Sequence, residues 1–524
     1  MKKLLAMALC VLLALSCLSF ASAEEEIAYP LNSDEEISIG LYTSYPGYSA
    51  KYSEAIEDPW FAELVKRIGA NIVFVEPARG ADRTQAYNLM LAGNTYPDVI
   101  MGSDAIKNAA ARIEENVIIP LNDYIDKYAP NLTKFMAEHP EVKKTYTTDN
   151  GDFICFPSLR GSETETGLWI NQAWLTECGL EAPETLDELT SVLLAFKDKY
   201  GVVPFSMGTG LLDKEGTGSY ASIHTIFDAY GVPTRYSWFR DKEQKVHLSA
   251  YEEGYRNAMK FIRSWYEQGL LDLDYASVDT KIIASKAAAQ EIGAFICDYQ
   301  VYVHIDAALD GAENTWVPVK DPKVNKDDPH AYYGRLTLTS SNGACVTTAC
   351  KNVPLACQIL DYLYSDEGFT FYNYGIEGVS FNYNADGQPE YTDTYKNGPE
   401  GMGEYAAIYT PAVCGAYPAG FKSGEAGRAR NSQIMRDAED TWMEGGTEDW
   451  WLMPVLSATT EETETYTDLN SIISTYCGEM YHKFITGEAD LDNGWDQYID
   501  TLKGMGVEDM IAIKQAQLDR FNAR

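Results

Sequence analysis

The sequence is poor in histidine and in basic residues, and both shortages exclude classes of function. Only six histidines occur in 524 residues, and they do not cluster. No Cys-x-x-Cys pair is present either, so the sequence gives little support for a metal site of the zinc type. Against 78 acidic residues there are 41 basic ones, a formal net charge of −37. This charge would repel nucleic acid and anionic membrane surfaces, so neither is expected as a partner.

Familiar catalytic motifs are also missing. No Gly-x-Ser-x-Gly, His-Glu-x-x-His or phosphate-binding Gly-Lys-Ser/Thr sequence stands out. The sequence therefore predicts no enzyme and no cofactor. A secreted glycoside hydrolase stays open as an alternative, because that chemistry needs only two carboxylates at a defined separation.

Outside the N-terminus, the sequence lacks an apolar run long enough to span a membrane. Lys2 and Lys3 precede an uncharged stretch, 4–18, and the small residues 21–23 follow it. This order is typical of a secretory signal peptide over residues 1–23, so the mature chain is expected to be exported. Lipid attachment at Cys17 remains an alternative, although Ala14 stands where that signal usually has leucine.

Length and composition favour a soluble protein with more than one core. A chain of 524 residues exceeds what one hydrophobic core normally supports. Its 36 tyrosines and 10 tryptophans suit a carbohydrate groove as well as a core. Disulfides are permitted by export, but the cysteine spacing shows no framework, so buried free thiols are expected. The cysteines beyond the signal segment are Cys155, Cys178, Cys297, Cys345, Cys350, Cys357, Cys414 and Cys477.

Strand and helix patterns alternate along the chain, which predicts two α/β lobes. The first part runs β-α-β-α-β, which predicts a parallel sheet with helices on its faces. Strands are expected at 36–41, 71–75, 98–101, 167–171 and 292–296. Helices are expected at 60–68, 83–92, 185–200, 252–268 and 353–365. The helix at 185–200 begins with a capping box, Thr185 to Glu188. The acidic stretch 459–464 is expected to be a solvated loop.

Four stretches carry a resemblance to a known family. They are Gly93–Ile100, then Leu168–Leu175 with Thr185–Leu189, then Tyr362–Gly368 with Tyr374–Gly378, and finally Phe484–Glu488 with Trp495, Tyr498 and Gln515–Arg520. In their order and spacing the chain resembles the family 1 extracellular solute-binding proteins, in the subgroup named after lipoproteins of the LipO type. The resemblance implies a two-lobed periplasmic-binding-protein-like fold of type II, with a ligand cleft and a three-segment hinge. It further implies a monomer that captures a small solute, most simply an oligosaccharide, for an ABC permease. A peptide or lipid receptor of the same fold is an alternative.

The family pattern also suggests where the lobes begin and end. Hinge segments are expected near 156–167, 292–298 and 340–346. Lobe one then comprises 36–158 plus 298–342, and lobe two comprises 166–292 plus 346–524.

Ligands of open α/β sheets bind beyond the carboxyl ends of the strands, which directs attention to the loops there. After the first strand come Tyr42 and Tyr45, which could stack on a sugar or simply pack as a surface loop. After the third strand come Ser103 and Asp104, and Asp104 could bind sugar hydroxyls or cap a helix.

Further candidates follow the hinges. Arg160 could bind ligand or pair with a carboxylate, and Trp169 could be a ring platform or core. By family position, Tyr220 is an aromatic of the cleft. Asp298 and Tyr299 follow the strand at the second hinge, where Tyr299 is expected to be an aromatic platform. Asn342 and Glu377 are weaker candidates. The segment 382–393 approximates a calcium loop, although a β-hairpin turn at 385–387 explains it more simply.

Overall fold

The computed structural model describes residues 27–42, 49–161, 166–207, 224–328, 338–444 and 451–524. The chain divides into two compact units. Unit 1 comprises residues 1–106, 112–158 and 342–421, and unit 2 comprises residues 107–111, 159–341 and 422–524. The predicted signal segment, Tyr45 and Tyr220 lie outside the described residues.

A six-stranded sheet in the order β14-β4-β11-β3-β1-β2 organises unit 1. Its strands are β1 (Ser33–Leu41), β2 (Ala70–Val75), β3 (Val99–Gly102), β4 (Phe156–Arg160), β11 (Thr339–Val346) and β14 (Gly420–Lys422). β1 pairs in parallel with both β2 and β3, while β11 runs antiparallel to β3. The predicted β-α-β-α-β start is therefore confirmed.

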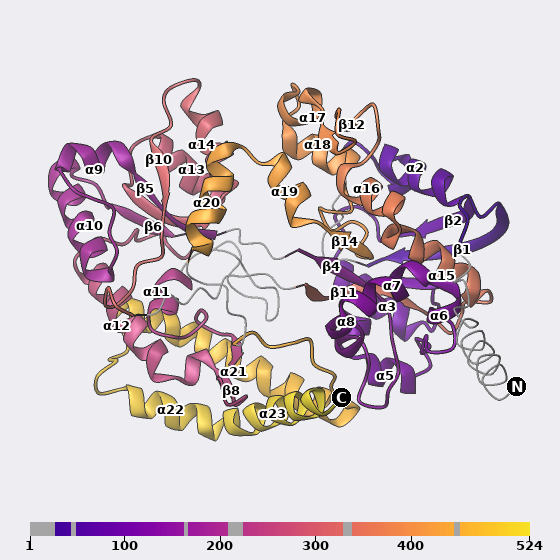
Figure 1. The fold of residues 1–524 in the computed structure, drawn as a ribbon. Coiled ribbons are helices and arrows are strands. Elements are labelled where there is room, and N and C mark those ends of the chain that lie inside the picture. Colours follow the sequence, from indigo (N-terminus) through magenta and orange to yellow (C-terminus); the bar gives the residue numbers. More distant parts are fainter. Residues whose placement is uncertain (1–26, 43–48, 162–165, 208–223, 329–337, 445–450) are drawn as a thin grey trace, which may run out of the picture. The chain divides into compact units, whose positions relative to one another are not determined.

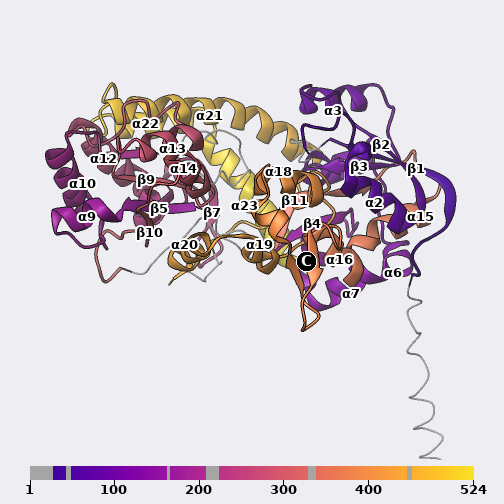
Figure 2. The same cartoon turned by 90° about the horizontal axis from the view of Figure 1, so that it is seen from above.

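Short helices surround this sheet, and Figures 1 and 2 show the indigo N-terminal elements among orange ones from 342–421. The helical segments of the first stretch are η1 (Ala55–Glu57), α2 (Pro59–Ile68), α3 (Arg83–Ala92), α4 (Asp104–Lys107), α5 (Ala109–Glu114), α6 (Ile125–Tyr128), α7 (Pro130–Glu138) and α8 (Pro140–Thr145). Those of the later stretch are α15 (Val353–Asp361), η3 (Tyr362–Tyr364), α16 (Asp366–Tyr374), α17 (Asp393–Asn397) and α18 (Met402–Tyr409). Trp60 stacks on Phe371 with ring centroids 4.9 Å apart, so both stretches share one core.

Unit 2 contains a four-stranded sheet in the order β10-β5-β9-β6. Its strands are β5 (Thr166–Asn171), β6 (Phe205–Met207), β9 (Ala294–Asp298) and β10 (Trp316–Val319), and a separate hairpin is formed by β7 (Trp238–Arg240) and β8 (Val246–Leu248). Every residue of β5, which pairs antiparallel with β9 and β10, is buried. Leu168 and Ile170 pack in one hydrophobic cluster, and Trp169 packs in another. Strand β9 begins and ends two residues later than expected.

The helices of unit 2 come from two distant stretches of sequence. The first supplies α9 (Gln172–Cys178), α10 (Leu186–Tyr200), α11 (His224–Ala229), η2 (Ser249–Tyr251), α12 (Glu253–Glu267), α13 (Thr280–Ala288) and α14 (Val301–Leu309). The second supplies α19 (Gly424–Arg430), α20 (Gln433–Met443), α21 (Thr460–Thr486), α22 (Trp495–Gly504) and α23 (Val507–Ala523). The predicted capping box at Thr185 and Glu188 is confirmed at the start of α10. α21 packs along α12, as Figure 2 shows.

The division into units differs from the expected lobes in three segments, the shortest being residues 107–111, which belong to unit 2. Residues 298–341 belong to unit 2, because β10 pairs with β5 and α14 packs on α13. Residues 346–421 belong to unit 1, because α15 packs on α6 and the Asp361 carboxylate accepts hydrogen bonds from the backbone N–H groups of Asn131 (3.1 Å) and Leu132 (2.8 Å). The boundaries between the units fall inside β4, β11 and β14 and at both ends of 107–111, and none falls at 292–298.

Two smaller predictions have clear outcomes. The loop predicted at 459–464 is wrong, because Thr459 is the N-cap of α21 and forms a capping box with Glu462. Acidic residues in the first turn of a helix are favourable near its dipole, so an acidic run also suits a helix start. The segment 382–393 contains the predicted hairpin, with β12 (Phe381–Tyr383) paired to β13 (Pro389–Tyr391) and the side-chain oxygen of Asn384 accepting from the N–H of Gln388 at 2.9 Å.

The described cysteines are free thiols, as expected. Five of them are buried: Cys155, Cys297, Cys345, Cys357 and Cys477. Among the helices that the structure describes, none combines the length and the apolar character needed to span a membrane.

Candidate ligand-binding residues

The carboxyl ends of β1 and β3 bring several predicted ligand residues of unit 1 together. The backbone N–H of Tyr42, just after β1, donates to the carbonyl of Met101 in β3 at 3.2 Å. Ser103 and Asp104 directly follow β3, so they lie at the same edge of the sheet. All three predicted residues are partly exposed. We call these three residues, together with the neighbours Arg83, Tyr87, Arg112 and Asn342, the unit 1 edge cluster.

Asp104 forms the charged centre of this cluster. Both Nε and Nη2 of Arg112, on α5, lie 2.9 Å from its Oδ2. The pKa of Arg112 is raised, because its neighbours Asp104 and Glu115 outweigh the lowering effect of its burial. Asp104 is therefore held in place by an ion pair, and it begins α4.

Aromatic rings lie beside this ion pair. Tyr42 contacts Tyr87 of α3 edge to face, with ring centroids 5.8 Å apart. Burial raises the pKa of Tyr42, and burial followed by the Asp104 carboxylate raises that of Tyr87. Both phenols thus stay protonated at neutral pH, as hydrogen-bond donors. A buried guanidinium, Arg83, donates through Nη1 to the carbonyl of Leu41 at 2.8 Å and fixes the end of β1.

Asn342 belongs to the same edge. β11 pairs with β3 so that Gly343 lies opposite Gly102, and one further step of this antiparallel register places Asn342 opposite Ser103. Asn342 is exposed. A side chain at Gly343 would place its Cβ 2.8 Å from the carbonyl oxygen of Phe156, so glycine permits this close strand packing.

In unit 2, Asp298 and Tyr299 lie where β9 ends. Asp298 is partly exposed, and its Oδ2 accepts from the hydroxyl of Thr280 at 3.3 Å. Its Oδ1 accepts from the backbone N–H of Gln300 at 2.9 Å. Tyr299, expected as an aromatic platform, is only 5% exposed and packs in a cluster with Val301 and Ile305.

Trp169 matches its core alternative. Its ring is fully buried in β5, with the Phe295 ring stacked 6.3 Å away and the Trp442 ring edge-on at 5.6 Å. A Cβ at Gly167 would come within 2.3 Å of Trp442, which shows how tightly this core is filled. The structure therefore offers no open face of Trp169 to a ligand.

The remaining predicted residues are scattered. Arg160 ends β4, is partly exposed, and donates its backbone N–H to Leu338 at 3.1 Å. Glu377 is exposed in the turn between α16 and β12. Sequence reasoning missed Tyr87, Arg112 and Arg83, because each lies on a helix and reaches the strand ends only through tertiary packing.

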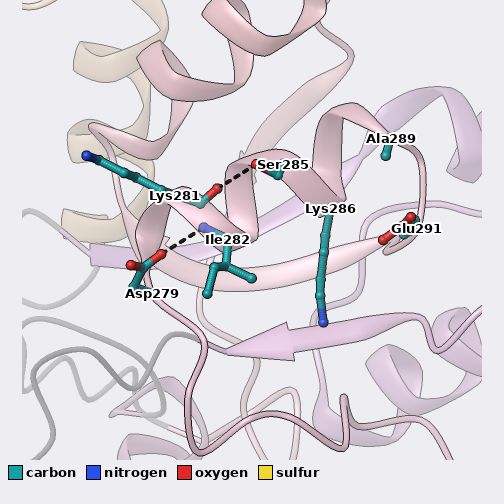
Figure 3. Close-up of a pocket in the computed structure, with 7 residues that line it drawn as sticks. All are labelled: Asp279, Lys281, Ile282, Ser285, Lys286, Ala289 and Glu291. Carbon is teal, nitrogen blue, oxygen red and sulfur yellow. Dashed lines mark hydrogen bonds between the residues drawn. The ribbon is translucent and has the colours of Figure 1, made fainter.

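Shallow depressions occur elsewhere on both units. One of about 380 Å³ on unit 2 runs along α13 and is lined by Asp279, Lys281, Ile282, Ser285, Lys286, Ala289 and Glu291. Figure 3 shows the Lys286 side chain turned away from the helix, and its ammonium pairs with Asp272. A second depression, on unit 1, lies along α3 and includes Asp82 and Leu89. Neither contains a residue that the sequence predicts to bind ligand.

Comparison with known proteins gives consistent results. By sequence, the chain is 24% identical over 473 residues to the fructooligosaccharide ABC transporter substrate-binding protein FusA of Streptococcus pneumoniae, covering 84% of each chain. It is 23% identical over 314 residues to lipoprotein LipO of Bacillus subtilis, covering 56% of this chain and 58% of that one.

Solved structures share the fold. FusA of Streptococcus pneumoniae in complex with kestose superposes with a TM-score of 0.73 at 21% identity, covering 93% of this chain and 100% of that one. The alginate-binding protein AlgQ2 gives a TM-score of 0.71 at 20% identity, covering 93% of this chain and 98% of that one. A solute-binding protein of Bifidobacterium longum infantis, described as binding HMO, gives 0.74 at 18% identity, covering 93% of this chain and 99% of that one.

The family model of the bacterial extracellular solute-binding proteins matches residues 47–368, more than half of the chain. That match spans β3, β5, β9 and β11, the strands whose ends carry most of the candidate residues. The chain thus belongs to the family of bacterial extracellular solute-binding proteins.

Proposed function

We propose that this chain is the receptor of an ABC importer and that it captures an oligosaccharide. The observation that carries the proposal is the sequence match, over 84% of each chain, to a receptor named for fructooligosaccharides. The unit 1 edge cluster supports it chemically. Tyrosine rings can cover the apolar face of a sugar, while the carboxylate of Asp104 and the amide of Asn342 suit its hydroxyls.

The proposed role is capture without catalysis. The receptor closes around the sugar by hinge motion and passes it to the transmembrane subunits of a permease, working as a monomer. The mature chain begins at Glu24 after export, and lipid attachment at Cys17 is the alternative. Intact mass of the secreted protein separates the two, because lipidation leaves residue 17 at the N-terminus.

A thermal-shift screen of the mature chain, Glu24 to Arg524, tests the ligand class. The panel holds fructooligosaccharides, alginate oligosaccharides and milk oligosaccharides, with peptides as controls. Ligand at 100 times its dissociation constant adds about 2.7 kcal/mol to the free energy of unfolding. We expect a rise in Tm of roughly 5–10 °C with one sugar class. A shift with peptides alone would overturn the carbohydrate assignment.

Two variants localise the binding. D104N removes the charge at the centre of the unit 1 edge cluster and is expected to weaken sugar binding at least tenfold, since hydrogen bonds to charged groups contribute about 1.5–3 kcal/mol. E63Q is the matched control, because Glu63 also pairs with an arginine, Arg67, at 2.9 Å but lies on α2. An equal loss of sugar affinity in both variants would mean that the unit 1 edge cluster is not part of the binding site. Chromatography of the sugar after incubation must show no cleavage.

A further inference from the structure

Unit 2 contains a buried group of potential metal ligands that the proposed function does not use. His224 and Asp228 lie four residues apart on α11, so they share one face of the helix. Asp321 follows β10 and completes the group. One potential ligand atom from each of the three side chains lies within 4.8 Å of the other two. Their exposed fractions are 7%, 2% and 5%, respectively.

The Asp321 carboxylate is the unusual member. Its Oδ1 accepts a hydrogen bond from the hydroxyl of Thr225 at 2.7 Å. Its Oδ2 lies 4.0 Å from Nε2 of His224 and has no hydrogen-bond partner within the part of the chain that the structure describes. Burial raises the pKa of Asp321 to about 7. A buried carboxylate oxygen without a partner carries a free-energy penalty that a cation at this position would remove.

We propose that His224, Asp228 and Asp321 bind a divalent first-row transition metal, with Zn²⁺ as the representative ion. One imidazole nitrogen and two carboxylates form a ligand set that zinc accepts, whereas Ca²⁺ and Mg²⁺ take oxygen ligands. Tetrahedral zinc at 2.0–2.1 Å from its ligands holds them about 3.3 Å apart, so the group contracts by roughly an ångström on binding.

Neighbouring contacts support this arrangement. Thr225 fixes one oxygen of Asp321 and leaves the other directed at His224, as hydrogen-bonded partners of metal-binding carboxylates commonly do. The two aspartates together would offset the charge of the ion. The site belongs wholly to unit 2, so it would stabilise that unit whether or not sugar is bound.

The test measures zinc directly on the chelator-treated mature chain. Isothermal titration and elemental analysis are expected to give one Zn²⁺ per chain, and Ca²⁺ or Mg²⁺ is expected not to compete at equal concentration. D321N keeps the shape of the side chain and its bond from Thr225 while removing the charge. We expect D321N and D228N each to weaken zinc binding at least tenfold.

H247Q is the matched control, because His247 also lies near two carboxylates, 3.2 Å from Asp241 and 2.9 Å from Glu252, but is partly exposed. It should keep wild-type zinc affinity. Circular dichroism of the metal-free variants checks folding, and D321N should melt no lower than wild type without metal. Absence of stoichiometric zinc in wild type, unchanged affinity in D321N and D228N, or loss of zinc in H247Q overturns the proposal. The sugar screen is run on the metal-free protein, so failure of the zinc proposal can be distinguished from failure of the proposed function.

Discussion

At the scale of single residues, buried carboxylates govern how the protein responds to pH. Asp58, the N-cap of α2, is fully buried, and its Oδ1 accepts from the N–H of Trp60 at 2.9 Å. Burial raises the pKa of Asp58 to about 7, well above the usual value near 3.9. Between about pH 4 and pH 7 the folded chain therefore holds a proton that the unfolded chain has released. The contribution of Asp58 to the free energy of unfolding therefore falls as pH rises through this window.

The variant D58N isolates that contribution. Asparagine caps helices as well as aspartate does and does not ionise, so it should keep the Trp60 contact. We expect the free energy of unfolding of D58N, relative to that of wild type, to increase by about 1–3 kcal/mol as the pH rises from 5 to 8. Urea titrations of both proteins at a series of pH values measure this, and the subtraction cancels other titrating groups. Parallel pH profiles would contradict the assignment.

The candidate site shows what sequence can indicate about residues and what it cannot. Strand ends are visible in sequence, so Tyr42 and Asp104 could be assigned from local pattern to the loops after two strands. Asn342 was suggested only by the family resemblance, and its place beside Ser103 depends on the pairing of β11 with β3. Whether an aromatic residue faces ligand or core is not local information. Trp169 is fully buried because Trp442, far along the chain, covers its ring. The zinc group was hidden for a similar reason, since Asp321 is distant in sequence from His224.

At the scale of elements, a capping signal located the start of one helix correctly. Gly201, with a positive φ of 70°, ends α10, and the helix starts at the predicted capping box. The same signal was present at Thr459 and Glu462, but composition suggested a loop there. Glu462 accepts from the N–H of Thr459 at 3.0 Å and also pairs with Arg520 of α23 at 2.8 Å. Arg520 lies far from Glu462 in the sequence, so a local sequence pattern could not show that it helps to stabilise the start of α21.

Removing the cap of α21 tests its contribution. T459A removes the hydroxyl that accepts from the N–H of Glu462 at 3.2 Å, and we expect a cost of about 1 kcal/mol. Scanning calorimetry should show a Tm lower by roughly 2–4 °C. T467A is the matched control, since Thr467 is exposed inside α21 and its hydroxyl only donates to Thr463. Alanine there should be neutral or slightly stabilising. Equal losses in both variants would argue against the cap.

At the scale of the whole molecule, each unit is assembled from distant stretches of sequence. The alternation of strands and helices predicted an α/β fold correctly, because periodicity is local. The order of strands in a sheet is not local, so the assignment of 298–341 and 346–421 to a unit could not be read from the pattern. Pairing of β10 with β5, and the stack of Trp60 on Phe371, decide these assignments.

This discontinuity predicts how fragments of unit 2 behave. A fragment of residues 159–341 contains the whole four-stranded sheet but lacks α19 to α23. The missing helices supply Phe484 and Trp495 to the core, and the hydroxyl of Tyr498 donates to the carbonyl of Ala250 at 2.9 Å. Each large ring deleted from a core costs about 3–5 kcal/mol, so losing several exceeds the stability of an ordinary domain.

We therefore expect the fragment 159–341 alone to show no near-ultraviolet circular dichroism and no cooperative transition in urea. Co-expression with residues 422–524 should restore both, because that segment carries the missing half of the core. The intact mature chain provides the reference signal. A fragment 159–341 that unfolds cooperatively by itself would mean that the sheet and its first helices form a sufficient core. In that case the C-terminal helices would be an addition to unit 2 rather than part of what makes it fold.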